Sequence, residues 1–249
     1  MGVFYPSKET KKLTYYSKLF NTAEIDSTFY AYPKKGLVFG WDKNTPSGFR
    51  FSAKLPSLIT HEKELDLEKG VELDLMHFLE LVNPLKVKGK LGPILIQLPP
   101  KFKKDSTRLE DFLAIPPGDL KFAIEFRNRS WWNRDSWALL EKYNVANTIV
   151  DEPLLPPDSI ITADFSFLRW HGKGRRPWYN YWYRKEELEP WIPKLKDISN
   201  NVKEVYGYFN NHFHGYAIQN CLQTMEMLGS IKPEQSEVKS HVDSYLEKK

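Results

Sequence analysis

Short apolar runs alternate along the chain with segments in which apolar residues recur every three or four positions. The runs are bounded by Pro, Gly and polar residues and predict strands, whereas the periodic segments predict helices. Strand alternating with helix favours a mostly parallel sheet covered by helices. We predict strands over residues 22–28, 49–55, 92–98, 120–127, 145–151, 160–170 and 203–210, and helices over 71–82, 106–113, 134–143, 185–199 and 215–228.

A single domain is the organisation that the pattern favours. The run at 92–98 is apolar on both faces, which is typical of a strand covered by helices on each side. No Gly/Ser linker and no shift of composition divides the series, so we predict one domain over 1–231 and a charged tail over 232–249. In the tail, Val238, Val242 and Tyr245 can line one side of a short helix, which is solvated or docked, or else binds a partner.

Charged or titratable residues stand two positions apart near the carboxyl ends of three predicted strands. This spacing puts both members of a pair on the same side of the strand, and leaves Ile25, Phe126 and Trp170 on the opposite side, under helices. In a (β/α) barrel the carboxyl ends of the strands form the rim where active sites are built. The alternative is a buried ion-pair network that only sets strand register. The pairs are Glu24 with Asp26, Glu125 with Arg127, and Arg169 with His171.

Several segments, taken in order, resemble the signatures of the YecE-like family, catalogued as domain of unknown function 72. The resemblance implies a TIM barrel and implies no particular activity. Carried over by position, the polar signature of the family falls on Glu24, Lys54, His61, Gln97, Glu125, Arg127, Asp151, Arg169, His171 and Asn210. The matching segments are EIDSTFY at 24–30, FRFSAK at 49–54, THEKEL at 60–65, LGPILIQLPP at 91–100, AIEFRNRSWW at 123–132, VDEP at 150–153, FLRWHG at 167–172 and VYGYFNNHFHGYAIQN at 205–220.

Two departures from the family pattern change what we expect of the first strand and of the residues beside Glu24. Family members usually begin with a further strand and a glycine-containing turn before the FYP segment, whereas this chain begins MGVFYP. We therefore expect an α/β fold of the TIM-type (β/α) barrel class whose first strand is missing or displaced. Asp26 also stands where the family more often has Asn, which adds a carboxylate beside Glu24.

The carboxylates of these strand ends are candidate ligands for a divalent metal. Glu24, Asp26, Glu125 and Asp151 offer oxygen atoms, which suit Mg²⁺ or Mn²⁺ better than zinc because no thiolate accompanies them. His212 and His214 are further candidates, although we interpret them as histidines flanking the start of a helix.

The same strand ends carry candidate catalytic and binding groups. Histidine has an ordinary pKa near neutrality, so His171 is the candidate proton carrier, with Glu125 or Asp151 to orient it or to act as base. Lys54, Arg127 and Arg169 can hold a phosphate or carboxylate, and arginine can do so with two hydrogen bonds. The predicted catalytic residues are Glu24, Glu125, Asp151 and His171; the predicted substrate-binding residues are Lys54, His61, Gln97, Arg127, Arg169, Asn210, Asn211, Trp178 and Trp182.

Aromatic residues are unusually frequent, and many gather in one loop. The chain has 8 Trp, 13 Tyr and 15 Phe against 32 Asp and Glu. Basic groups interleaved with rings are the two components of grooves for single-stranded nucleic acid, but the loop also fits a lid that packs over the barrel or a surface that stacks on sugars. It interleaves Lys173, Arg175, Arg176, Arg184 and Lys185 with Trp178, Tyr179, Tyr181, Trp182 and Tyr183.

Composition narrows the classes of partner and the cellular compartment that we expect. The net charge of +4 permits a phosphate-bearing partner without requiring one. The single cysteine, Cys221, fits a reducing compartment, and the sequence shows neither a signal peptide nor a membrane-length apolar run, so we expect a cytoplasmic protein without a membrane partner.

These observations predict a barrel enzyme, a hydrolase or related lyase, that acts on a phosphate-bearing substrate. Nucleic acid or a nucleotide is the preferred substrate, and Mg²⁺ or Mn²⁺ assists by clamping phosphate oxygens and activating water. One alternative is a glycosidase in which Glu24 or Asp26 pairs with Glu125 as acid and nucleophile. Another is a non-catalytic protein that binds an anionic ligand.

Overall fold

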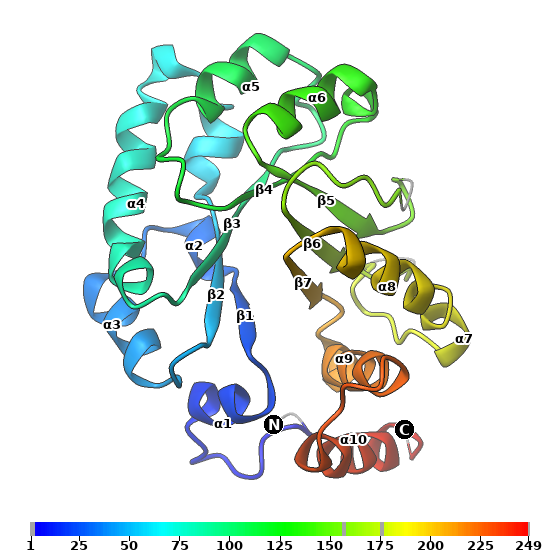
Figure 1. Cartoon of the computed structure of the whole chain (residues 1–249). Helices are drawn as coiled ribbons and strands as arrows, with labels where there is room; N and C mark the ends of the chain where they lie inside the picture. The colour runs from blue at the N-terminus through cyan, green and yellow to red at the C-terminus, as the bar shows by residue number, and fades with distance from the viewer. Residues whose placement is uncertain (1–2, 156–157, 175–176, 249) are drawn as a thin grey trace. The chain divides into compact units, whose positions relative to one another are not determined.

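The computed structural model describes residues 3–155, 158–174 and 177–248. Within them, seven strands form one sheet in chain order, β1 to β7 (Figure 1). The pairs from β1 to β5 run parallel, with Gln97 of β3 opposite Glu125 of β4. The fold class predicted from the sequence, an α/β fold of the TIM-type barrel class, is confirmed. The strands are β1 (Thr22–Ile25), β2 (Arg50–Lys54), β3 (Leu91–Gln97), β4 (Phe122–Glu125), β5 (Ala146–Asp151), β6 (Phe165–Trp170) and β7 (Glu204–Phe209).

The helices between the strands follow the predicted series with one correction. The segment 185–199 is not one helix, because Pro190, which has no N–H to donate, stands where α7 ends and α8 begins. In the described residues a helix, not a strand, precedes β1. The α-helices are α1 (Lys12–Leu19), α2 (Ser27–Tyr30), α3 (Lys35–Lys43), α4 (Val71–Val87), α5 (Ser106–Leu113), α6 (Arg134–Lys142), α7 (Lys185–Leu188), α8 (Trp191–Asn201), α9 (Tyr216–Met227) and α10 (Pro233–Leu246).

Side-chain caps fix where two of these helices begin. The carboxylate of Asp105 accepts a hydrogen bond from the backbone N–H of Arg108 at 3.0 Å, at the start of α5. The amide oxygen of Asn133 accepts one from the backbone N–H of Ser136 at 3.2 Å, at the start of α6. Each cap satisfies a backbone donor that has no partner inside the helix.

The chain divides into two compact units. Unit 1 consists of Met1–Leu19, Ile149–Ser159 and Leu168–Lys249, and unit 2 of Phe20–Thr148 and Ile160–Phe167. In unit 2, apolar side chains of β2, β3 and β4 pack against α4, α5 and α6. Phe126, which follows β4, stacks on Trp131 with ring centroids 4.5 Å apart, and is buried as its place opposite the polar positions predicts.

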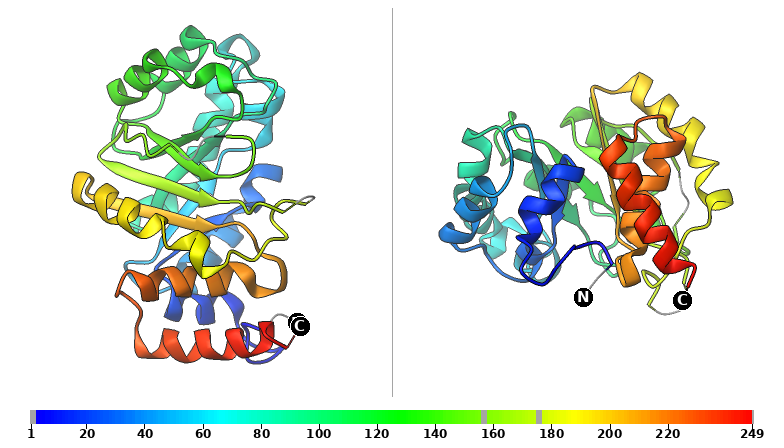
Figure 2. Two further views of the ribbon diagram at one scale, coloured as in Figure 1. Left: turned by 90° about the vertical axis from the view of Figure 1, so that its right-hand side faces the viewer. Right: turned by 90° about the horizontal axis from the view of Figure 1, so that it is seen from below.

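Unit 1 has its own aromatic core. The ring of Trp170, at the end of β6, stacks on Phe209 of β7 at 4.6 Å and meets Trp191 of α8 edge-on at 5.2 Å. The charged tail forms α10, which lies alongside α9 (Figure 2). Its docked side buries Val242 and Leu246, whereas Tyr245, predicted for that side, is exposed.

Candidate functional site

Polar residues end the strands as the sequence predicts. Lys54, Gln97, Glu125 and Asp151 are the last residues of β2, β3, β4 and β5. His171 and Asn210 directly follow β6 and β7. Arg169 lies in β6, two residues before His171, and is 1 % exposed. Their positions agree with the prediction, and their functional roles stay predictions.

In unit 2, the strand-end carboxylate of Glu125 is paired with a guanidinium. Glu125 is fully buried, and Nη2 of Arg127 contacts its Oε1. The two residues are two positions apart, so this contact is the pairing expected from their spacing. Because water does not reach the carboxylate, its interaction with the arginine takes place in a medium of low dielectric constant.

Glu24 and Asp26, expected to share one side of a strand, lie in different elements of the structure. β1 ends at Ile25, and the backbone of Asp26 has helical dihedral angles because α2 begins at the next residue. Asp26 is exposed and its Oδ1 lies 3.1 Å from Nζ of Lys54, which also lies over the ring of Phe29. The spacing of two therefore does not place Asp26 on the same strand face as Glu24.

His61 lies near the same strand ends in unit 2. It is part of a one-turn helix, Leu58–Glu62, where its Nδ1 is 2.9 Å from the hydroxyl of Thr60 and its ring meets Phe29 edge-on. Burial lowers the pKa of His61, and the positive charges of Lys54, Lys101 and Arg127 lower it further. Burial first, and these cations second, thus favour the neutral form of His61, and Glu64 opposes them.

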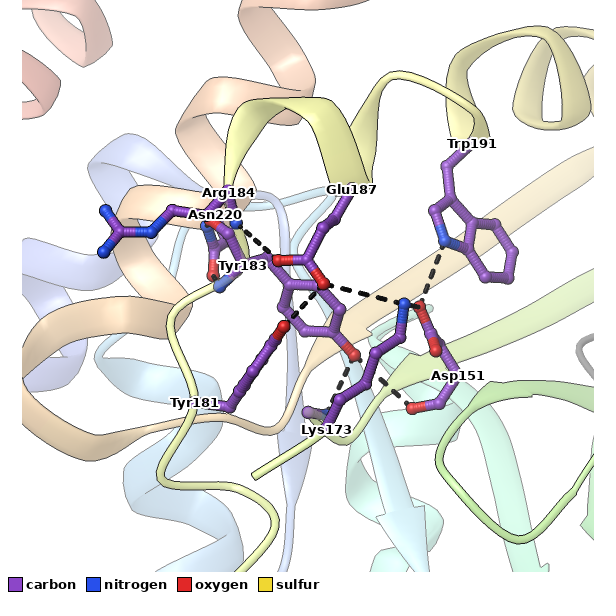
Figure 3. Close-up of polar contacts among 9 residues, drawn as sticks. Asp151, Lys173, Tyr181, Tyr183, Arg184, Glu187, Trp191 and Asn220 are labelled. Carbon is purple, nitrogen blue, oxygen red and sulfur yellow. Dashed lines mark hydrogen bonds and ion pairs between the residues drawn. The ribbon is translucent and has the colours of Figure 1, made fainter. Parts of the chain in front are cut away.

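In unit 1, Asp151 is a buried carboxylic acid with three neighbours. Its side chain is 7 % exposed. Its Oδ2 accepts a hydrogen bond from the indole N–H of Trp191 at 3.2 Å and lies 3.5 Å from Nζ of Lys173. Burial raises the pKa of Asp151, and Lys173 and Trp191 oppose that shift only in part. Figure 3 shows Lys173 reaching both Asp151 and Glu187, which is on α7.

The raised pKa of Asp151 predicts how its replacement changes stability with pH. The folded protein binds the Asp151 proton more tightly than the unfolded chain does, so ionisation costs the folded state free energy as pH rises from the ordinary value of 3.8. Relative to Asp151→Asn, the wild-type protein should lose stability as the pH rises above about 4. Urea unfolding of both proteins at increasing pH measures the difference, and a constant or opposite difference would contradict the raised pKa.

His171 has a side-chain partner on the next strand end. It is buried, and its Nδ1 lies 3.2 Å from the amide nitrogen of Asn210. Its backbone N–H donates to the carbonyl of Asp151 at 3.0 Å, and the backbone N–H of Asn210 donates to Trp170 at 2.8 Å. Regular strand hydrogen bonds thus continue to the residues that carry the candidate chemistry.

The loop after β6 is anchored by buried polar groups. The hydroxyl of Tyr183 accepts from the backbone N–H of Gly172 at 2.9 Å. Asn220 of α9 binds both the backbone N–H and the carbonyl of Tyr183, and Asn211 donates to the carbonyl of Tyr181 at 2.8 Å. Asn211, predicted to bind substrate, therefore uses its amide nitrogen to hold this loop. Glu187 accepts from the hydroxyl of Tyr181 and from the backbone of Arg184 (Figure 3).

The loop tryptophans predicted to bind substrate are both half-buried. The indole N–H of Trp182 donates to Gln219 at 2.9 Å, and its ring stacks on Tyr216. The carbonyl of Trp178 accepts from the backbone of Gly174 at 3.2 Å. Arg175 and Arg176, two of the basic residues singled out in this loop, lie outside the described residues.

The predicted metal site gains no support from the structure. Within residues 3–155, 158–174 and 177–248, no three His, Cys, Asp or Glu side chains are grouped to hold a metal ion. Three of the four predicted carboxylate ligands contact a cationic side chain instead: Asp26 contacts Lys54, Glu125 contacts Arg127, and Asp151 contacts Lys173.

Three residues around Asp151 could not be assigned to it from the sequence. Trp191 is 40 positions from Asp151, and Lys173 is 22 positions away on the next loop. Glu187 looks like an ordinary acidic residue in the first turn of a helix. The only available signal was their place in the aromatic and basic segment after β6.

Comparisons with known proteins place this arrangement in a family. The sequence matches the family described as "Protein of unknown function DUF72" over residues 1–241. The chain belongs to the DUF72 family. The UPF0759 protein YunF of Bacillus subtilis is 29 % identical over 253 residues, with 90 % of this chain and 89 % of the relative covered. The UPF0759 protein YecE of Escherichia coli is 32 % identical over 206 residues, which cover 72 % of each chain.

Solved structures of DUF72 proteins have the same fold. A DUF72 family protein from Thermotoga maritima has a TM-score of 0.80 and 29 % identity, and covers 90 % of this chain and 92 % of that one. One from Enterococcus faecalis has a TM-score of 0.79 and 26 % identity, covering 89 % and 90 %. The family resemblance seen in the sequence is thus confirmed, and it carries no specific activity. Among the described helices of this DUF72 protein, none is both long and apolar enough to cross a membrane.

Proposed function

We propose that this DUF72 protein is a hydrolase, or a related lyase, that acts on a phosphate-bearing substrate at the strand ends of unit 1. Asp151 is the observation that supports this most directly: it is a buried carboxyl whose pKa stays raised although Lys173 and Trp191 both contact it. Buried titratable groups with perturbed pKa values are concentrated at catalytic sites. Ending a strand of a TIM-type barrel, Asp151 also has the position that catalytic residues of this fold occupy.

The neighbours of Asp151 within unit 1 supply the other roles. In the proposed reaction Asp151 takes a proton from the attacking water as the water oxygen bonds to phosphorus, and the bond between phosphorus and the leaving oxygen breaks. In the proposed reaction the Asn210 amide turns its oxygen toward Nδ1 of a protonated His171 ring, and the ring passes its Nε2 proton to the leaving oxygen and becomes neutral. Arg169 and Lys173 supply positive charge for the phosphate oxygens.

Replacing the two titratable groups should abolish most of the activity. We expect Asp151→Asn and His171→Gln each to lower the rate of phosphodiester cleavage by about 10²- to 10⁴-fold, the usual contribution of a positioned acid or base. The assay uses the full chain with bis(p-nitrophenyl) phosphate, which has no nucleobase, and with labelled oligonucleotides, with and without Mg²⁺ or Mn²⁺.

Matched controls lie on exposed helical positions of the same unit. Asp197→Asn on α8 and His241→Gln on α10 should leave the rate at the wild-type level. Unchanged cleavage in the Asp151 and His171 variants would contradict the assignment. Tight binding of phosphate esters without turnover would favour the non-catalytic binding protein. The absence of both binding and turnover would contradict the choice of substrate.

The glycosidase alternative has less support. It needs Glu24 or Asp26 and Glu125 as a proton donor and a nucleophile. Glu125 contacts Arg127 and Asp26 contacts Lys54. Two of its three candidate carboxylates are thus engaged by cations of the protein itself.

A further inference from the structure

Rings from two distant segments of unit 1 stack on one another. We call Tyr179, Trp182, His212, Phe213, His214 and Tyr216 the ring surface. The ring of Tyr179 lies 5.3 Å from that of His212, with 18° between their planes, and 5.6 Å from that of Phe213. The ring of Trp182 lies 5.9 Å from that of Tyr216, with 2° between their planes. His214 meets both Phe213 and Tyr216 edge-on, so contacts between rings run from one stacked group to the other.

The ring surface differs from core aromatics in its exposure. Tyr179 is 40 % exposed, and His212 and His214 are also exposed. Core rings of the same unit, such as Trp170 and Trp191, are buried. Stacked rings that remain open to water leave apolar area for a planar ligand to cover.

Buried amides hold the loop side of this surface in place. Asn220 and Asn211 are fully buried and bind the backbone of Tyr183 and Tyr181, which flank Trp182. Gln219 accepts from the indole N–H of Trp182 and donates to Asp243 of α10. A loop fixed in this way has already lost conformational freedom, so it loses less conformational entropy when a ligand binds.

The charge around the rings favours an anionic ligand. Within the described parts of this loop, residues 172–174 and 177–185, three residues are Lys or Arg and none is Asp or Glu, and residues 205–225 include no Asp or Glu. Among the described cations, the guanidinium of Arg184 lies 4.3 Å from the ring centre of Trp182. A neutral sugar gains nothing from such charge, whereas the phosphates of a nucleic acid do.

We propose that the ring surface binds single-stranded nucleic acid by stacking its bases on Tyr179 and His212, with the neighbouring cations facing the phosphates. Stacking of this kind tolerates any base sequence because every base has an aromatic face. The inference rests on the proposed function for its substrate class, but it concerns binding and is measured without turnover.

Fluorescence anisotropy of a labelled oligothymidine with the full chain tests the proposal. We expect Tyr179→Ala and His212→Ala each to weaken binding by about 5- to 100-fold, the range seen for loss of one stacked base, while Tyr179→Phe retains most of the affinity. The matched control is Tyr245→Ala, since Tyr245 is an exposed tyrosine of the same unit on α10. An oligodeoxyribose phosphate without bases should bind more weakly, and Tyr179→Ala should not weaken it further.

Four outcomes would overturn the inference. Equal affinity of wild-type and Tyr179→Ala protein for oligothymidine would exclude stacking on this ring. Equal binding of the strand without bases would assign the affinity to phosphates alone. Binding of a neutral oligosaccharide but not of oligothymidine would make the ring surface a carbohydrate site. Cleavage of bis(p-nitrophenyl) phosphate without oligothymidine binding would overturn this inference alone, and oligothymidine binding without any cleavage would overturn only the proposed hydrolase.

Discussion

Replacing Arg127 with methionine is expected to destabilise the folded protein by about 3–5 kcal/mol, because it removes the cation that contacts a buried carboxylate. Glu125 is 0 % exposed and the Arg127 side chain is 16 % exposed. Methionine fills a similar volume with apolar atoms, so the decrease in the free energy of unfolding reports the missing charge partner more than a cavity.

The double variant distinguishes an ion pair from two unrelated residues. Adding Glu125→Gln to Arg127→Met removes the buried carboxylate charge that Arg127 contacted, and we expect it to recover a large part of the lost stability. The control is Arg134→Met, which breaks the exposed pair with Glu141 and should cost less than about 1 kcal/mol. Urea unfolding of the wild-type protein and these three variants gives the three changes in stability. A loss below about 1 kcal/mol in Arg127→Met, with no recovery in the double variant, would contradict a coupled pair.

Replacing Gly172 with alanine should cost roughly 2–5 kcal/mol, because a left-handed backbone and a steric overlap combine at one position. Gly172 has φ +91°, which L side chains rarely adopt. An added Cβ would lie 2.4 Å from the carbonyl oxygen of Trp178 and 2.8 Å from Cβ of Tyr181. The loop that begins at Gly172 would have to move, and Lys173 would move away from Asp151 with it.

Thermal or urea unfolding of Gly172→Ala measures this cost, with Gly40→Ala as the control. Gly40 lies inside α3 with nothing within 4 Å of an added Cβ, so alanine there should stabilise the protein by about 0.5–1 kcal/mol. A Gly172→Ala protein as stable as wild type would mean that the loop has room to rearrange.

Local patterns predicted most of the fold. Six of the seven strands lie within the predicted runs, and β3 begins one residue before its run, because strand residues covered by helices are mostly apolar. The failures were also local. Pro190 divides the segment predicted as one helix, and Asp26 belongs to the start of α2 although the apolar run seemed to include it.

The sequence by itself determined, to within two residues, which polar residues lie at the strand ends. Lys54, Gln97, Glu125, Asp151, His171 and Asn210 have these places because strand boundaries follow from local alternation of apolar and polar residues. The contact of Glu125 with Arg127 was also foreseeable, since both residues belong to one short segment.

Only the tertiary structure decided the partners of these residues. Trp191 reaches Asp151 from a helix 40 positions away, Lys54 turns to Asp26 of the preceding segment, and Asn220 holds the loop beside Trp182. A side-chain contact depends on where two elements come together in space, and burial, which raises the pKa of Asp151, depends on everything packed around it. Neither quantity is a property of a local sequence pattern.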